Sequence, residues 1–314
     1  MVRRWNCLPL VAVLAGGMLA TSDVAAAQGA APAAERGGRT RVVMLGTGVP
    51  PADPERFGAA VVVLVDSTPY LFDMGVGVVR RWTAALRSGI APSLGASSLR
   101  TAFVTHLHSD HTLGYAELIF TSWTLEGAPR RPLDVYGPEG LQRMTDHLLA
   151  AYTEDVAVRT GPEGELAGSP PPVVRVHEVG PGVVYRDSLV TVTAFSEHHG
   201  TWAHAFGYRI QTPDRTIVLS GDTGPPSGVV DQCRGCDILL HEGGSVTDAE
   251  AGPYFRRFHV TAEELAAIAR ATRPRLLVLY HQRPAAPAVE RAYGVLRSLY
   301  DGAFVVARDL DVYR

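Results

Sequence analysis

The segment Thr105–His111, with the sequence T-H-L-H-S-D-H, constrains this chain more than any other stretch. It places three histidines and one aspartate within six residues, directly after the apolar run Ala102–Val104. That run is typical of a β-strand, so the polar side chains are expected where the strand ends and a loop begins. Imidazole and carboxylate groups are common ligands of zinc and similar divalent ions. The segment therefore predicts a metal site rather than a solvated histidine-rich turn.

The spacing within this segment predicts more than one ion. In an extended loop, alternate residues point to opposite sides, which would direct His106 and His108 to one side and Asp110 to the other. His111 breaks the alternation, so it can join Asp110 on a second ion. A dinuclear site is therefore expected.

Other predicted strands also end in residues that can bind metals. The run Ile217–Leu219 leads into Ser-Gly-Asp-Thr-Gly, whose glycines allow close approach, so Asp222 is expected to bridge two ions rather than to cap a turn. Two later apolar runs end at His241 and at His281. Asp73 follows an earlier strand, and it is expected either to hydrogen-bond the metal-binding loop or to cap a turn.

Short apolar runs separated by turns predict a β-rich chain with helices between the strands. The remaining predicted strands are Arg41–Leu45, Ala59–Val65, Tyr70–Phe72, Leu133–Tyr136, Val174–Val176, Val183–Tyr185, Leu189–Phe195, Ala205–Ile210, Ile238–Leu240 and Leu276–Tyr280. The predicted helices are Val76–Arg87, Leu113–Phe120, Pro138–Tyr152 and a helix that a capping box opens at Thr261 and that continues to Ala271. The Gly- and Pro-rich segment Glu154–Pro172 shows no period and is expected to be a surface loop near the mouth of the site.

The N-terminus has the pattern of an export signal. Arg3 and Arg4 form a basic region, Leu8–Ala20 an apolar region and Ala25–Ala27 a small-residue cleavage site. Because the apolar run is shorter than the roughly 20 residues that a membrane span needs, no stable membrane anchor is expected after cleavage. We expect a periplasmic or secreted protein, by Sec or twin-arginine export, with a signal peptide at 1–27, a disordered leader at 28–40 and one catalytic domain at 41–314.

Composition excludes some chemistries. All 29 of the Lys and Arg residues are arginines, which excludes mechanisms that use a lysine nucleophile or Schiff base. Removal of residues 1–27 takes away two arginines and Asp23 and leaves 27 basic against 31 acidic residues, a net charge of −4. Such a chain is not basic enough to follow a polyanion unaided. Cys233 and Cys236 form either a disulfide, which export favours, or two buried thiols.

The order of these motifs resembles that of the metallo-β-lactamase superfamily. The motifs are His-x-His-x-Asp-His, His-Gly before Phe-Gly-Tyr-Arg, Ser-Gly-Asp-Thr, His-Glu, and a final His after an apolar strand. Within that superfamily the chain resembles the arylsulfatase and ribonuclease Z branch, most closely its exported arylsulfatase-like members, from about Val42 to the C-terminus. The resemblance implies an α+β fold, an αββα four-layer sandwich of two β-sheets between helices, with two metal ions at one edge.

The resemblance also implies a role for each matching residue. The expected ligands are His106, His108 and His199 for the first ion, Asp110, His111 and His281 for the second ion, and Asp222 as a bridge between them. His199 is preferred to the neighbouring His198 because the family ligand directly precedes glycine, so His198 and His204 are expected at the rim or in structural roles. Asp110 and His241 are the expected catalytic residues, with His241 as a proton donor or as a hydrogen-bond donor to the transition state. In the ribonuclease Ala-Thr follows the His-Glu pair, whereas Gly243 and Gly244 follow it here.

For three residues between these motifs, the sequence leaves two possible roles open. His259, just before the capped helix, is expected either to line the pocket or to have a local structural role. Arg256 and Arg257 are expected either to bind an anionic substrate as a fork or to form a solvated patch at the start of the helix.

These implications predict a zinc-dependent ester hydrolase in which a hydroxide bridges two divalent ions, with Zn²⁺ favoured, about 3.5 to 4 Å apart. True β-lactamases carry a cysteine ligand that is absent here, and the tRNA-gripping arm of the ribonuclease is replaced by the short segment 211–216. With export and negative charge added, we expect arylsulfatase-like action on small sulfate or phosphate esters and no nucleic-acid partner. The alternative is a lactonase or other carboxylic-ester or thioester hydrolase; a ribonuclease Z-type phosphodiesterase and a non-catalytic metal-binding protein are less favoured. The sequence is compatible with a homo-oligomer.

Overall fold

The computed structural model describes residues 39–92, 95–125 and 131–314. The predicted signal peptide lies outside these residues, as does all but the end of the predicted leader. The first strand begins one residue before the predicted start of the domain at residue 41, because Thr40 already pairs with Val65. Within the described part of the chain, no helix is both long enough and apolar enough to cross a membrane.

Two seven-stranded β-sheets form the centre of the domain. In spatial order the first sheet consists of β14 (Val312–Tyr313), β1 (Thr40–Gly46), β2 (Ala60–Val65), β3 (Thr68–Phe72), β4 (Thr101–Phe103), β5 (Leu133–Gly137) and β6 (Val174–Glu178). The second sheet consists of β13 (Phe304–Val306), β12 (Leu276–Leu279), β11 (Ile238–His241), β10 (Thr216–Leu219), β9 (Trp202–Gln211), β8 (Thr191–His199) and β7 (Gly182–Arg186). Both sheets are mixed, with antiparallel pairs toward one side and parallel pairs toward the other.

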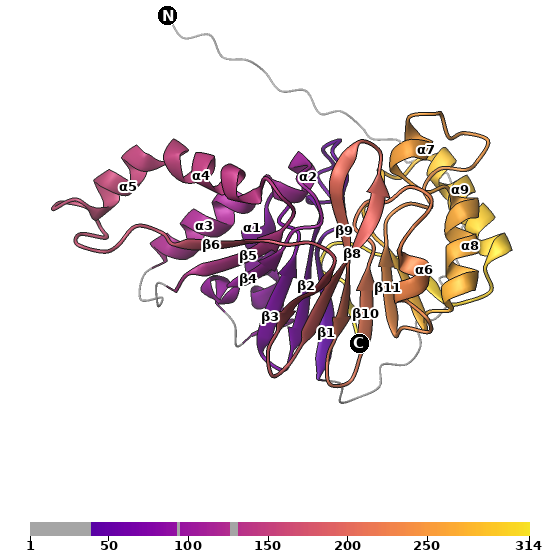
Figure 1. The fold of residues 1–314 in the computed structure, drawn as a ribbon, viewed down its shortest axis with the longest axis horizontal. Helices are drawn as coiled ribbons and strands as arrows, with labels where there is room; N and C mark the ends of the chain where they lie inside the picture. Colours follow the sequence, from indigo (N-terminus) through magenta and orange to yellow (C-terminus); the bar gives the residue numbers. More distant parts are fainter. Residues whose placement is uncertain (1–38, 93–94, 126–130) are drawn as a thin grey trace, which may run out of the picture. The chain divides into compact units, whose positions relative to one another are not determined.

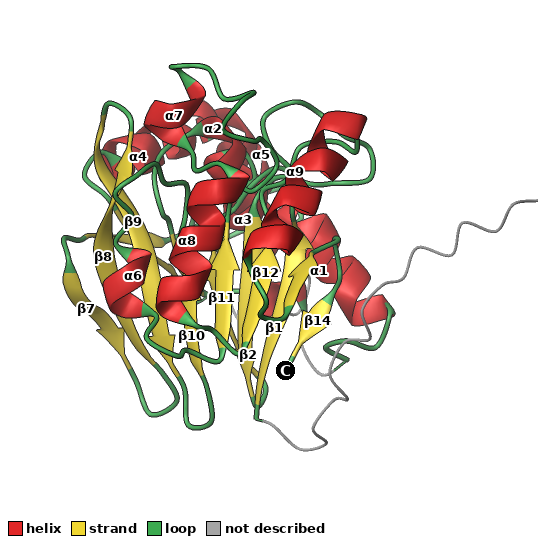
Figure 2. Cartoon of the chain, turned by 90° about the vertical axis from the view of Figure 1, so that its right-hand side faces the viewer, coloured by secondary structure: helices red, strands yellow, loops and turns green. Residues whose placement is uncertain are grey.

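Helices cover the outer face of each sheet (Figures 1 and 2). Over the first sheet and along its edge lie α1 (Val78–Arg87), the short 3₁₀-helix η1 (Ala96–Ser98), α2 (Ser109–Thr112), α3 (Tyr115–Thr124), α4 (Leu141–Ala151) and α5 (Thr153–Thr160). The second sheet is associated with α6 (Val229–Gln232), α7 (Phe255–Phe258), α8 (Ala262–Thr272) and α9 (Pro287–Leu299).

Three apolar cores account for this layering. Along β1, Val43 and Leu45 pack with α1 and α3 on the outer side, whereas Val42 and Met44 pack between the sheets. This division follows from the two-residue repeat of a strand, which sends successive side chains to opposite faces. A third core joins the second sheet to α8 and α9. The prediction of an αββα sandwich is therefore confirmed.

Some elements differ from the sequence prediction. The expected loop Glu154–Pro172 begins inside helix α5, which has acidic residues in its first turn and no buried residues. The apolar residues of this helix, Val156–Val158, are consecutive, so they do not show the apolar period that would reveal a helix. The end of this segment packs away from the strand ends that carry the metal-type residues, because Leu166 belongs to the outer core of the first sheet and Pro170 accepts a hydrogen bond from Trp123. The prediction that it lies at the mouth of the site is therefore wrong.

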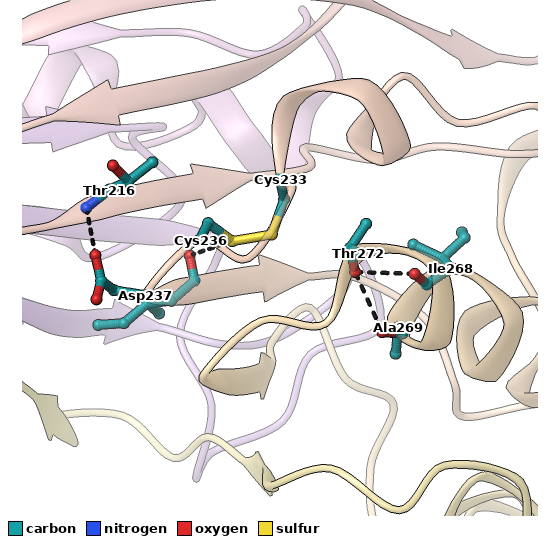
Figure 3. Close-up of a disulfide and its surroundings, with 8 residues drawn as sticks. Thr216, Cys233, Cys236, Asp237, Ile268, Ala269 and Thr272 are labelled. Atoms are coloured by element: carbon teal, nitrogen blue, oxygen red, sulfur yellow. Dashed lines mark hydrogen bonds between the residues drawn. A yellow bond between two sulfur atoms is a disulfide. The ribbon is translucent and has the colours of Figure 1, made fainter.

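The two cysteines form a disulfide (Figure 3). Cys233 directly follows α6 and Cys236 precedes β11, and both residues are buried. The covalent link fixes the short connection between this helix and the strand that leads to His241. Of the two alternatives that the sequence left open, the structure contains the disulfide.

Candidate metal centre

The segment Thr105–His111 follows β4 as expected, but its second half lies in the short helix α2 instead of the extended loop that the sequence predicted. His108 takes the N-cap position of α2, and Asp110 and His111 lie in its single turn. Behind the segment, the buried Asp73 carboxylate accepts hydrogen bonds from the backbone N–H of Thr105 at 2.8 Å and from its hydroxyl at 3.0 Å. Of the two roles that the sequence left open for Asp73, the structure shows the contact with the metal-binding loop.

The seven side chains that the sequence singled out as ligands converge in two groups. The first cluster consists of His106, His108, His199 and Asp222, and the second cluster consists of Asp110, His111 and His281. Within each cluster the potential ligand atoms lie within 4.8 Å of one another. The contributing segments follow β4, β8, β10 and β12, which end at the same edge of the two sheets, near α2 and α7 (Figure 1).

Asp222 faces both clusters. Its carboxylate oxygens lie 3.9 Å from Nε2 of His106 and of His199 in the first cluster. They also lie 3.4 Å from Nε2 of His111 and 3.5 Å from Nε2 of His281 in the second cluster. Although burial opposes ionisation, the imidazoles of His281 and His111 hold the pKa of Asp222 well below its usual range. The carboxylate therefore has the position and the charge of a bridging ligand.

Hydrogen bonds behind the imidazoles orient the rings. His199 donates from Nδ1 to the carbonyl oxygen of Phe258 at 2.8 Å, and His111 donates from Nδ1 to the Asp73 carboxylate at 2.8 Å. A proton held on Nδ1 leaves Nε2 as the ring atom with a free lone pair. Each of these Nε2 atoms faces the Asp222 carboxylate.

The chemistry of this set fits divalent metal ions. Nε2 of His111 and Oδ1 of Asp222 are buried without a hydrogen-bond partner, which is costly unless an ion occupies the space between the ligands. Burial lowers the pKa of His106 and of His199, so both rings are neutral near pH 7, the form that binds metals. His106 and His199, as neutral imidazoles beside the ionised Asp222 carboxylate, are ligands of the kind that zinc and related divalent ions take.

Two further histidines, His241 and His259, lie beside the clusters and differ in protonation state. His241 is fully buried, its Nδ1 is 2.5 Å from the carbonyl oxygen of Glu242, and its Nε2 has no hydrogen-bond partner. Burial lowers the pKa of His241, which favours the neutral ring. His259 lies at the rim with Nδ1 3.3 Å from the Glu242 carboxylate. Although burial opposes protonation, that carboxylate raises the pKa of His259 to about 9.

His259 therefore lines the site, which decides between its two predicted roles. Its ring centroid is 5.5 Å from that of His199 and 6.1 Å from that of His281. Gly243 and Gly244, which directly follow Glu242, both have positive φ and so take a backbone conformation that glycine tolerates best.

Other predicted residues stay outside the two clusters. His198 is exposed on β8, and His204 pairs at 3.4 Å with the exposed Glu139. Arg256 donates to the backbone oxygen of Asp248 at 2.7 Å and pairs with its carboxylate, so it is not available as a fork for an anion. Arg257 is exposed on the short helix α7.

The aromatic side of the first cluster was not predicted from the sequence. Trp202 pairs with His199 across the β8–β9 hairpin, and its indole N–H lies 2.7 Å from Nε2 of His108. Phe258 meets the ring of His199 edge to face, at 5.2 Å between centroids. The short His-Gly-Thr-Trp hairpin was the signal available for Trp202, because the two ends of so short a hairpin must lie opposite each other.

Comparison with known proteins gives one family. Residues 68–282 match the model of the β-lactamase superfamily domain. Ribonuclease Z from Mycobacterium sp. (strain KMS) is 34% identical over 248 residues, which cover 77% of this chain and 84% of the relative. Ribonuclease Z from Mycobacterium bovis (strain BCG / Pasteur 1173P2) is 30% identical over 277 residues, 86% of this chain and 96% of the relative.

These relatives correct the functional prediction. They are named as ribonucleases, so the expected arylsulfatase-like action on small sulfate or phosphate esters is wrong. The expectation that nucleic acids are not among the partners is wrong for the same reason, since solved structures of similar fold include tRNases. Net negative charge, export and the missing arm favoured a small ester, but none of these features changes the chemistry that the metal centre can perform.

Solved structures agree with this assignment. Human tRNase Z, short form, is 25% identical with a TM-score of 0.64, over 87% of this chain and 98% of that protein. The metallo-β-lactamase fold protein YhfI from Bacillus subtilis is 16% identical with a TM-score of 0.66, over 88% of this chain and 99% of that protein, and shares the fold. The chain therefore belongs to the metallo-β-lactamase superfamily of metal-dependent hydrolases, in its ribonuclease Z-like branch.

Proposed function

We propose that this protein is a metal-dependent phosphodiesterase that cleaves RNA. The two clusters would hold two divalent ions, for which we favour zinc. The observation that carries the proposal is the position of the Asp222 carboxylate between two groups of ligand atoms. Two ions in such a site activate water and neutralise the charge that develops on phosphate oxygens. The names of the ribonuclease Z relatives supply the substrate class.

The protein side chains would then orient the reactants and move protons. Asp222 sets the separation of the two ligand groups, and Asp73 fixes the ring of His111 through Nδ1. Asp110 is nearly buried and accepts from Nε2 of His281 at 2.9 Å, which places an ionised carboxylate where a proton can be taken from water. Its role as a base stays a prediction.

We assign the role of general acid to His259, which would donate a proton to the leaving oxygen. The ring is protonated near pH 7 because of Glu242, and it lies at the rim, where a substrate can reach it. A general acid must carry its proton at the working pH and lie within reach of the leaving group. His241 is neutral and fully enclosed, so the earlier expectation that it donates the proton has less support.

The proposal is tested on the full chain reconstituted with zinc. The substrate is a precursor tRNA with an unpaired 3′ trailer, and cleavage is followed on denaturing gels with the Asp222→Asn variant as control. We expect cleavage by the native protein that a chelator stops and that zinc restores. Intact RNA in the presence of protein that carries two equivalents of zinc would overturn the proposal.

We also propose that the protein is exported, on the pattern of residues 1–27, which lie outside the described residues. The disulfide of Cys233 and Cys236 supports this, because such bonds persist in oxidising compartments. N-terminal sequencing of the mature protein is expected to begin after Ala27, and an intact Met1 would contradict it.

A further inference from the structure

The rim of the first cluster is built from aromatic side chains. The ring of Trp202 contacts that of His108, with centroids 4.9 Å apart. Phe258 contacts the ring of His199 and fills the space beside Gly200, where any Cβ would meet its ring. These contacts connect the rim directly to side chains that face the metal site.

Tyr254 extends this rim into solvent. Its ring lies on that of Phe258, with centroids 4.7 Å apart and planes 27° from parallel. The residue is 72% exposed, so the ring face away from Phe258 is free. Tyr254 is therefore a supported aromatic surface, only two ring contacts away from His199.

The charges around the rim favour approach of an anionic chain from the Tyr254 side. Arg257, exposed in the same short helix, is held next to the β8–β9 hairpin because its carbonyl accepts from Gly200 at 2.8 Å. Beyond the hairpin lies a hollow of about 440 Å³ whose lining includes Glu139 and Glu178. Carboxylates repel a phosphate backbone, whereas an arginine attracts it.

We propose that Tyr254 stacks on an unpaired base adjacent to the phosphodiester that is cleaved, and so helps to position RNA in the site. Single-stranded RNA is bound mainly through bases that stack on exposed aromatic rings. This role gains weight here because β9 and β10 are joined by a tight turn, in which the backbone N–H of Thr212 donates to the carbonyl oxygen of Arg215 at 2.9 Å, so no RNA-gripping arm extends from this hairpin. The inference rests on the proposed ribonuclease function.

The first test separates binding from chemistry. Tyr254→Ala is expected to raise KM for the 3′-trailer RNA roughly 5- to 100-fold, because loss of one stacked base costs about that much in affinity. The kcat value and the zinc content should stay within about twofold of the native protein. Tyr254→Phe should restore KM, since it keeps the ring. Tyr152→Ala is the matched control, because Tyr152 is also exposed and contacts another ring, that of Phe120, but lies between α4 and α5.

The second test identifies the base. Oligonucleotides in which one nucleotide near the cleavage point is abasic are compared with the intact RNA for native protein and for Tyr254→Ala. At the stacked position the abasic substrate should weaken binding to the native protein and leave Tyr254→Ala unaffected. If the native protein cleaves RNA but KM is insensitive to Tyr254→Ala, or no abasic position removes that sensitivity, this inference fails while the ribonuclease proposal stands. If the zinc-loaded native protein cleaves no RNA, the ribonuclease proposal itself has failed.

Discussion

The two ligand clusters share Asp222 but differ in the charge that surrounds them. In the first cluster the ring N–H of His199 is bound by a neutral backbone carbonyl, and three imidazoles meet one carboxylate. In the second cluster His111 is bound from behind by the carboxylate of Asp73, and Asp110 adds a further carboxylate beside His281. More negative charge favours a cation more strongly, so the two ions should differ in affinity. We expect the second cluster to hold its ion more tightly.

Removal of the shared ligand should abolish the difference between the clusters. Asp222→Ala takes away the one carboxylate that faces both groups, so both ions should bind weakly and activity should fall by at least about 10³-fold, well above the 10- to 100-fold typical of a residue behind the ligands. Elemental analysis of the purified variant checks the stoichiometry, and Asp231→Ala, an exposed aspartate on α6, is the control. One equivalent of metal retained by Asp222→Ala would show that Asp222 belongs to a single cluster.

The next largest effect is expected for a change at His259, which should lower turnover while both clusters keep their metal ions. His259→Ala removes the protonated group at the rim, and loss of a general acid typically lowers the rate by about 10²- to 10⁴-fold. The effect should shrink for phosphodiesters whose leaving group needs no proton, such as p-nitrophenolate. Turnover and metal content are compared with those of His241→Ala and of His147→Ala, an exposed histidine on α4. A larger loss of turnover in His241→Ala, with metal intact, would return the role of proton donor to His241.

The smallest effect is expected at Asp73, whose carboxylate adds negative charge behind the second cluster. Asp73→Asn keeps a side chain that tolerates the positive φ of 57° at this position and removes the charge behind His111. We expect a loss of roughly 10- to 100-fold in affinity for one ion, that of the second cluster, and little change for the other. Stepwise titration with zinc measures both affinities. Asp66→Asn is the matched control, because Asp66 also has a positive φ of 54° but pairs with Arg39 at the surface.

The sequence was sufficient for much of this site, because metal ligands are restricted in type and tend to follow strands. Alternation placed His106 and His108 together, and a strand end placed Asp222 at the same edge. The pairing of Glu242 with His259 could not be predicted, since it depends on how α7 folds back over the edge. Trp202 was missed for a similar reason, because its contact with His108 arises only when the hairpin meets the first loop.

The fold was likewise predicted only in part from local sequence patterns. Both sheets were anticipated from short apolar runs, although β13, β14 and helix α9 were not predicted. The buried residues of α9 have the spacing of an amphipathic helix, at Val289, Ala292, Tyr293 and Leu296, so this signal was present and unused. Substrate class was wrongly predicted because the metal centre provides the same chemistry to several esters, whereas the choice among them depends on the rim.

Each cluster takes ligands from both sheets. The stability of the folded protein should therefore depend on the supply of metal ions. The segment after β4 belongs to the first sheet, whereas His199, Asp222 and His281 follow strands of the second sheet. An ion in either cluster would cross-link the two halves of the sandwich and bind the native chain in preference to the unfolded one. At a free concentration 100 times Kd, one such ion adds about 2.7 kcal/mol to the free energy of unfolding. Metal starvation would then expose the protein to proteolysis as well as inactivate it.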